Sequence, residues 1–139
     1  MRDEQSQDVS WPGVGEAGAV QSYEDLRVWQ AGIALCTDVY EVSRTFPGDE
    51  RFGLTSQMRQ AAVSVPSNIA EGWGRGTRAD YLRFLRIARG SLFEIKTQVV
   101  IADRIGLAST AETARLAETI EALRRPLQGL IRSLERAGS

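Results

Sequence analysis

The stretch VPSNIAEGWGRG, at residues 65–76, carries the residue types that most invite a chemical interpretation. Three alternating glycines, Gly72, Gly74 and Gly76, lie beside Arg75 and could present backbone amides to an anion. Both common phosphate-loop motifs follow a strand, and the Walker loop also ends in Gly-Lys followed by Ser or Thr. No strand pattern precedes this stretch, and it does not end in Gly-Lys followed by Ser or Thr. We therefore interpret the glycines as a turn in which Gly72 ends a helix as its C-cap, with an accessory anion site as the alternative.

The same stretch holds an acid that could serve as a general base. Glu71 lies three residues after Asn68, but the chain has no histidine and no second carboxylate nearby in sequence. We therefore expect both side chains to satisfy polar groups at a helix or subunit contact. Pro66 would cost about 3 kcal/mol inside an ordinary helix. Either the helix bends there, or a new helical segment begins. Pro66, Asn68, Glu71 and Gly72 are thus assigned to structure.

Metal and nucleophile chemistry find little support in the sequence. Cys36 is the single cysteine, so no intramolecular disulfide can form, and it falls on an apolar helical face without a histidine partner. With no histidine, neither a transition-metal cage nor a di-iron Glu-x-x-His pair is expected. We predict no metal, no cofactor and no catalytic residue, and hence a protein that is not an enzyme.

Arginine is concentrated in one part of a chain whose formal net charge is -1. Residues 51–90 contain seven arginines against Glu71 and Asp80. A basic stripe of this kind can contact RNA or another partner, and neighbouring aromatic side chains can stack on bases. The alternative is a solvated helix face with salt bridges between subunits. The candidate partner-binding residues are Arg75, Arg78, Arg83, Arg86 and Arg89, with Trp73, Tyr81 and Phe84 as stacking surfaces.

The elements that must position these residues are all helical. Residues 1–21 mix acids, glycine and serine without a hydrophobic period, which predicts a mobile acidic tail. Four amphipathic patterns follow within residues 22–139, at about 23–45, 54–71, 78–105 and 110–136. Capping boxes are predicted at Ser22/Asp25, Thr77/Asp80 and Ser109/Glu112. Short connections between four such helices predict an all-α, antiparallel up-down-up-down four-helix bundle.

Two of the helices are apolar on more than one face. In the first, the predicted core seam is Leu26, Trp29, Ile33, Cys36 and Tyr40, and Leu35, Val39, Val42 and Phe46 fall outside it. In the third, a long seam from Tyr81 to Ala102 leaves Phe84, Ile87 and Ile101 outside. A monomer would expose these side chains, so we predict a homo-oligomer. No apolar run is long enough to cross a membrane, and we expect a cytoplasmic protein.

Three segments of the chain closely resemble the four-helix bundle protein family, also called the 23S ribosomal RNA intervening-sequence protein family. The resemblance runs from about Tyr23 to Leu134. The segments are YEDLRVWQ, FPGDERFGLTSQMRQAAVSVPSNIAEGWGRG and YLRFLRIARGSLFEIKTQVVIADRIGL.

The resemblance implies an antiparallel four-helix bundle that assembles as a ring-like homopentamer. Members of the family are encoded in intervening sequences of some large ribosomal RNA genes, and no member is an established enzyme. A related accessory protein of diversity-generating retroelements is a basic pentamer that partners a reverse transcriptase and binds nucleic acid. We therefore expect a non-catalytic adaptor that contacts RNA or a protein such as a reverse transcriptase, and the alternative is a purely structural protein-protein scaffold.

Overall fold

The computed structural model describes residues 26–50 and 53–138. The predicted tail at 1–21 and the predicted capping box at Ser22 and Asp25 lie outside these residues. The described part is built from helices and contains no strand. Its elements are α2 (Arg27–Ser43), the short 3-10 helix η2 (Gly48–Glu50), α3 (Leu54–Gly74), α4 (Arg78–Arg104) and α5 (Thr110–Ala137).

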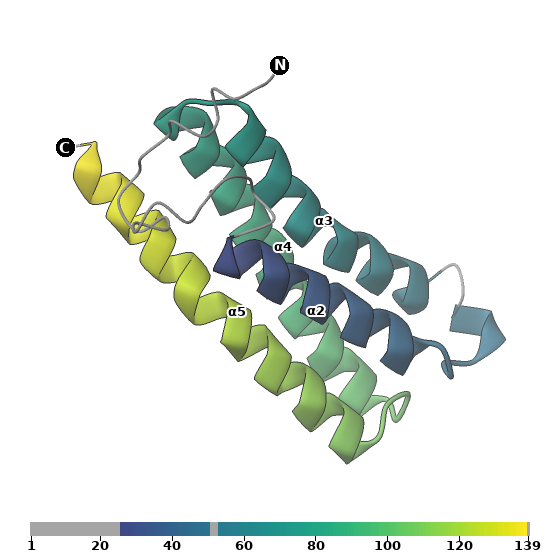
Figure 1. The fold of residues 1–139 in the computed structure, drawn as a ribbon. Helices are drawn as coiled ribbons and strands as arrows, with labels where there is room; N and C mark the ends of the chain where they lie inside the picture. The colour runs from purple at the N-terminus through teal and green to yellow at the C-terminus, as the bar shows by residue number, and fades with distance from the viewer. Residues whose placement is uncertain (1–25, 51–52, 139) are drawn as a thin grey trace.

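The four long helices form a four-helix bundle, as the sequence predicts. Each helix packs against the next one along the chain, and α2 also packs against α5, which closes the set around a shared core. Figure 1 shows the four helices lying side by side with roughly aligned axes. Every helix thus has two helical neighbours and keeps an outer face that the bundle does not cover.

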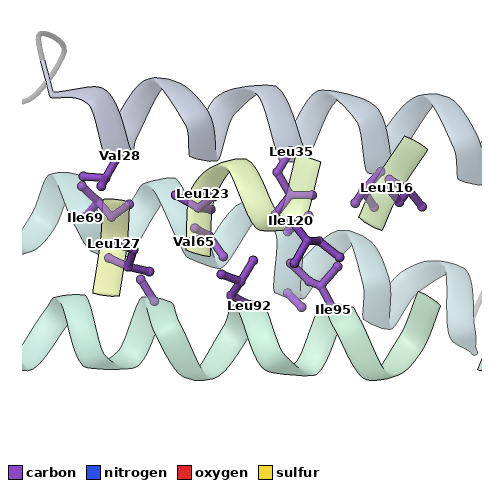
Figure 2. Packing of buried hydrophobic residues seen from close by; sticks show 14 of the residues in the cluster. Val28, Leu35, Val65, Ile69, Leu92, Ile95, Leu116, Ile120, Leu123 and Leu127 are labelled. Carbon is purple, nitrogen blue, oxygen red and sulfur yellow. The ribbon is translucent and has the colours of Figure 1, made fainter. Parts of the chain in front are cut away.

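The core of the bundle is filled by aliphatic side chains from all four helices. In Figure 2, Leu35 of α2, Val65 of α3, Leu92 of α4 and Leu123 of α5 point toward one another. Each of these four is at most 1% exposed. The predicted seam of α4 is confirmed, because all of its residues are buried: Tyr81, Leu85, Ala88, Leu92, Ile95, Val99 and Ala102. The apolar face of α5, from Leu116 to Leu134, is buried as well.

The predicted seam of the first helix is only partly correct, because Leu26 is buried and Trp29 and Cys36 pack against the core but the other two members face outward. Ile33 and Tyr40 are each 40% exposed, whereas Leu35 and Val39 are fully buried. This helix carries two interleaved apolar repeats, and helical spacing alone does not determine which one faces the core. Close packing on α3 selects one of the two repeats. The repeat that contains Gly32 faces the core, because Gly32 lets α2 lie against Pro66.

The turn between α3 and α4 begins later than predicted. The helix α3 continues through Gly72 to Gly74, so the assignment of Gly72 as a C-cap is wrong. Gly72 is buried, and a Cβ atom added there would lie 2.6 Å from the Cβ of Phe84. Gly72 is therefore a point of close approach between α3 and α4. The left-handed conformation that the turn requires falls on Gly76, whose φ is +84°.

The predicted capping box is complete at the start of α5, whereas only half of the one predicted at the start of α4 is formed. The Thr77 hydroxyl accepts a hydrogen bond from the Asp80 backbone N–H at 3.2 Å. A complete capping box begins α5, where Ser109 and Glu112 each accept a hydrogen bond from the other's backbone N–H. These caps satisfy backbone donors that the helices leave unpaired at their first turn.

Pro66 lies inside the single helix α3 and does not begin a new one. The proline is buried, and its ring side faces the Cα of Gly32, where an added Cβ would meet the Pro66 Cβ at 3.4 Å. The absence of a side chain on Gly32 thus lets α2 approach the proline ring. The contact explains why a residue that is costly in most helix interiors is accommodated here.

Candidate functional site

The five candidate arginines cluster around the turn between α3 and α4, but they do not form one stripe. Arg75 is the C-cap of α3, and the other four lie in the first half of α4. Their contacts divide them into two groups. Arg75 and Arg83 lie against Phe84, beside α3, whereas Arg86 and Arg89 contact α5. The predicted partner surface therefore consists of two separate patches.

The first patch is built around Phe84. The guanidinium carbon of Arg83 lies 4.5 Å from the centre of the Phe84 ring, and that of Arg75 lies 5.0 Å from it. Both distances are typical of cation–π contacts. Arg75 also pairs with Glu71 at 2.9 Å, and Arg83 pairs with Asp80 at 3.5 Å. The two guanidinium groups are thus held beside one aromatic ring while their side chains remain 46% and 56% exposed.

The aromatic residues of this region are not available as stacking surfaces. Trp73 is 3% exposed, Tyr81 is fully buried and Phe84 is 7% exposed. Phe84 is covered within its own chain because Gly72 lets it pack onto α3, so the premise that a monomer would expose it is wrong. Ile87 and Ile101, the other two predicted interface residues, are each 43% exposed.

The second patch joins α4 to the end of α5. Arg86 pairs with Glu135 at 2.7 Å, and Arg89 donates a hydrogen bond to the Gln128 side-chain oxygen at 3.2 Å. Arg78 lies against Gly138. A cleft of about 300 Å³ separates the two helices here and is lined in part by Arg78 and Arg86. These contacts link helices of one chain, so this patch serves bundle packing at least in part.

The ion pairs of both patches are exposed and therefore weak. Pairs between exposed side chains contribute about 0–1 kcal/mol to stability. A phosphate or carboxylate from a partner could replace Glu71 or Asp80 at little cost. The arginines of the first patch are thus oriented by Phe84 without being committed to their present acids.

The contacts of the two polar residues in the opening motif agree with the prediction for Asn68 but not for Glu71. Glu71 pairs with Arg75 at the end of its own helix and not across helices. The Asn68 side-chain amide donates to the Ser64 backbone oxygen and to the Ser64 hydroxyl, at 2.8 and 2.9 Å. That hydroxyl lies 2.8 Å from the hydroxyl of Ser91 on α4. Asn68 therefore supports a polar contact between helices through Ser64, and Glu71 does not.

The side chains that could react directly or bind a metal ion are the Cys36 thiol and the carboxylates. Cys36 is half-buried on α2, and burial raises the pKa of its thiol, which disfavours the nucleophilic thiolate. Within residues 26–50 and 53–138, no three His, Cys, Asp or Glu side chains are placed to hold a metal ion. None of the helices in this same part of the chain is long and apolar enough to cross a membrane.

Sequence reasoning gave no role to two arginines whose contacts are specific. Arg115 of α5 reaches α2, where it pairs with Asp38 at 2.7 Å and with Glu41. Arg59 of α3 instead lies over the Tyr40 ring, 4.7 Å from its centre, and donates to the Ser43 hydroxyl. A sequence signal for Arg59 did exist, because no acid occurs three or four positions before or after it.

A sequence model of the family described as 23S rRNA-intervening sequence protein matches residues 24–129. No curated protein matches the chain significantly.

Proposed function

We propose that this chain, which belongs to the 23S rRNA-intervening sequence protein family, is a non-catalytic binding protein whose Arg75 and Arg83 contact RNA. In this proposal the bundle has an antiparallel up-down-up-down order, assembles as a homopentamer and acts in the cytoplasm. Contacts between successive helices, and between α2 and α5, support the antiparallel order.

The observation that carries the RNA proposal is the pair of guanidinium groups beside Phe84. Arginine binds phosphate with a planar fork of donors, and its flat face stacks on unpaired bases. Arg75 and Arg83 lie within 5.0 Å of one ring centre, so much of the entropy of ordering their side chains is already lost before a partner arrives. Since the nearby aromatic side chains are buried, the arginines supply both the charge and the stacking surface.

The non-catalytic part of the proposal is supported by the state of Glu71. This residue is the acid that the sequence offers as a general base. In the structure its side chain is 53% exposed and paired with Arg75. A carboxylate that is exposed and engaged by a neighbouring arginine is not placed to take a proton from a bound substrate.

RNA binding is tested by its salt dependence. A short fluorescein-labelled single-stranded RNA is titrated with the full chain between about 50 and 200 mM salt, and binding is followed by fluorescence anisotropy. Affinity should fall steeply with salt because counterions are released from the RNA. The slope of log affinity against log salt concentration should become shallower by about 1.4 per chain in the double variant Arg75→Ala/Arg83→Ala. Each lost phosphate contact contributes about 0.7 to that slope.

The matched control removes two arginines elsewhere. Arg104 and Arg132 are exposed, and the double variant Arg104→Ala/Arg132→Ala lowers the net charge equally. Its slope should stay near that of the unchanged protein. An equal loss in both double variants would mean that charge alone drives binding, and no binding at the lowest salt would exclude the RNA proposal.

A structural scaffold is the second candidate, and the exposed apolar side chains favour it. Phe93 of α4 is 48% exposed, and Ile105, which directly follows α4, is 57% exposed. Large apolar side chains on an outer face commonly mark contacts between proteins. If RNA does not bind, this observation leaves the scaffold as the better account, with the arginines engaged in contacts between protein chains.

A further inference from the structure

A groove on the outer side of α3 is distinct from both arginine patches. It has a volume of about 710 Å³ and runs along α3 beside Tyr40 of α2. That volume falls within the range of about 300–1,000 Å³ that is typical of sites for small molecules. Its lining is mixed, with Tyr40 and Val63 providing apolar surface and Ser56, Gln60 and Ser67 providing hydroxyl and amide groups.

Arg59 supplies the charge of this groove. Within residues 26–50 and 53–138, Arg59 forms no ion pair, and the groove lining contains no Asp or Glu. The Nε atom donates to the Ser43 hydroxyl at 2.9 Å, and the guanidinium lies over the Tyr40 ring. These two contacts fix the plane of the group and leave its terminal nitrogens as donors. A fixed guanidinium is suited to grip two oxygens at once.

A second residue of the lining, Thr55, has a hydroxyl group without a hydrogen-bond partner among the described residues. Thr55 is 7% exposed, and its hydroxyl is buried with no hydrogen-bond partner among the described residues. Buried hydroxyl groups in native proteins nearly always have a partner, so each exception needs an explanation. Thr55 lies one helical turn before Arg59 on α3. The groove thus combines a guanidinium without an acid and a hydroxyl without a partner.

We propose that this groove binds an organic monocarboxylate. The carboxylate accepts hydrogen bonds from the terminal nitrogens of Arg59, and the apolar body of the molecule lies against Tyr40 and Val63. A single positive charge balances one carboxylate, whereas a phosphate monoester carries about -1.5 to -2 and would leave negative charge uncompensated. The inference is independent of RNA binding, because Arg59 belongs to neither arginine patch.

The test uses benzoate as the probe, with benzamide as its neutral counterpart and phenyl phosphate as the competing anion. Calorimetric titration of the full chain gives the affinities, and the methyl NMR signals of Val63 report where the probe binds. Benzoate should bind saturably and shift the Val63 signals. Benzamide should bind at least about tenfold more weakly, because it lacks the charge-assisted hydrogen bonds.

Two variants test the assigned residues by different routes. Arg59→Gln removes the charge and should weaken benzoate binding by about tenfold or more. Val63→Trp keeps the charge but fills the groove at a position that is 42% exposed, and should abolish binding. The controls are Arg132→Gln and Ala122→Trp, which introduce the same residues at exposed positions elsewhere and should bind benzoate normally. Circular dichroism confirms that each variant is folded.

Several results would overturn the proposal. Failure of benzoate to saturate, or benzoate binding that neither Arg59→Gln nor Val63→Trp alters, excludes a carboxylate site in the groove. Tighter binding of phenyl phosphate than of benzoate excludes the monocarboxylate. Saturation by a peptide with one Glu between leucines, with no binding of benzoate, would assign the groove to a protein segment and not to a small acid.

Discussion

Gly72 shows how one residue can determine the approach of two helices. It lies within α3, and its missing side chain leaves the space that Phe84 of α4 occupies. The guanidinium groups of Arg75 and Arg83 in turn lie over the Phe84 ring. The geometry of the first arginine patch therefore depends on a glycine that sequence reasoning assigned to a turn.

Substitution of Gly72 should destabilise the bundle despite the better helix propensity of alanine. In Gly72→Ala, the new Cβ would meet the Phe84 Cβ at 2.6 Å, and overpacking of this kind costs about 1–3 kcal/mol. Gly90→Ala is the matched control, because Gly90 is an exposed helical glycine with no atom within 4 Å of an added Cβ. It should stabilise by about 0.5–1 kcal/mol. Urea denaturation measures both. A neutral Gly72→Ala would show that the helices separate easily here.

The sequence could predict which arginines gather near the turn but not what each one contacts. Spacing places Arg83 and Arg86 on the outer side of α4, and this is where they lie. Arg83 then meets Phe84, whereas Arg86 meets Glu135 of α5, which is distant in sequence. Contacts between helices depend on how far each helix slides along its neighbour, and a single helical pattern carries no such information.

At the scale of elements, the starts of α4 and α5 were predictable because N-terminal caps are local. The interactions of Thr77 with Asp80 and of Ser109 with Glu112 involve residues three positions apart, so the sequence contains both partners. The end of α3 was not predictable in this way, because packing against Phe84 gives Gly72 a role inside the helix. Likewise, the face of α2 that enters the core depends on Pro66 of α3.

Loss of the capping box should weaken α5 measurably. Ser109→Ala removes the acceptor for the Glu112 N–H and should lower the free energy of unfolding by about 1 kcal/mol, within a range of about 0.5–2. Thr110→Ala is the control, because Thr110 is the exposed first residue of the helix and forms no cap. Thermal and urea unfolding should rank Ser109→Ala clearly below Thr110→Ala. Equal stabilities would contradict a capping role for Ser109.

At the scale of the whole molecule, large apolar side chains remain exposed on the outer surfaces of the bundle. They lie on α2, α3 and α4 or directly after α4, and each is at least 40% exposed: Ile33, Tyr40, Val63, Ile87, Phe93, Val100, Ile101 and Ile105. Self-association was predicted from an overlapping set, the apolar residues outside the seams of the first and third helices. Five of its members, Leu35, Val39, Val42, Phe46 and Phe84, are buried within the chain itself, so self-association is now inferred from the exposed set.

Self-association can be tested directly through these side chains. Light scattering at micromolar concentration should give about five times the chain mass of 15.3 kDa. The double variant Ile87→Glu/Ile101→Glu should lower this mass, since each charge would be buried without a partner. Ala122→Glu on the exposed side of α5 is the control and should leave the mass unchanged. A monomeric unchanged protein would remove the basis for an assembly that uses Ile87 and Ile101.

The polar contact between Ser64 and Ser91 has a consequence for how the length of the protein can change. It lies about two helical turns from the Gly72–Phe84 contact, along both α3 and α4. These two contacts together fix how α3 and α4 are aligned along their length. One inserted residue between them in either helix would rotate everything beyond it by about 100° and break one contact. Insertions and deletions should therefore be tolerated in the connections between helices and excluded from these turns, except where both helices gain or lose about a whole number of turns together.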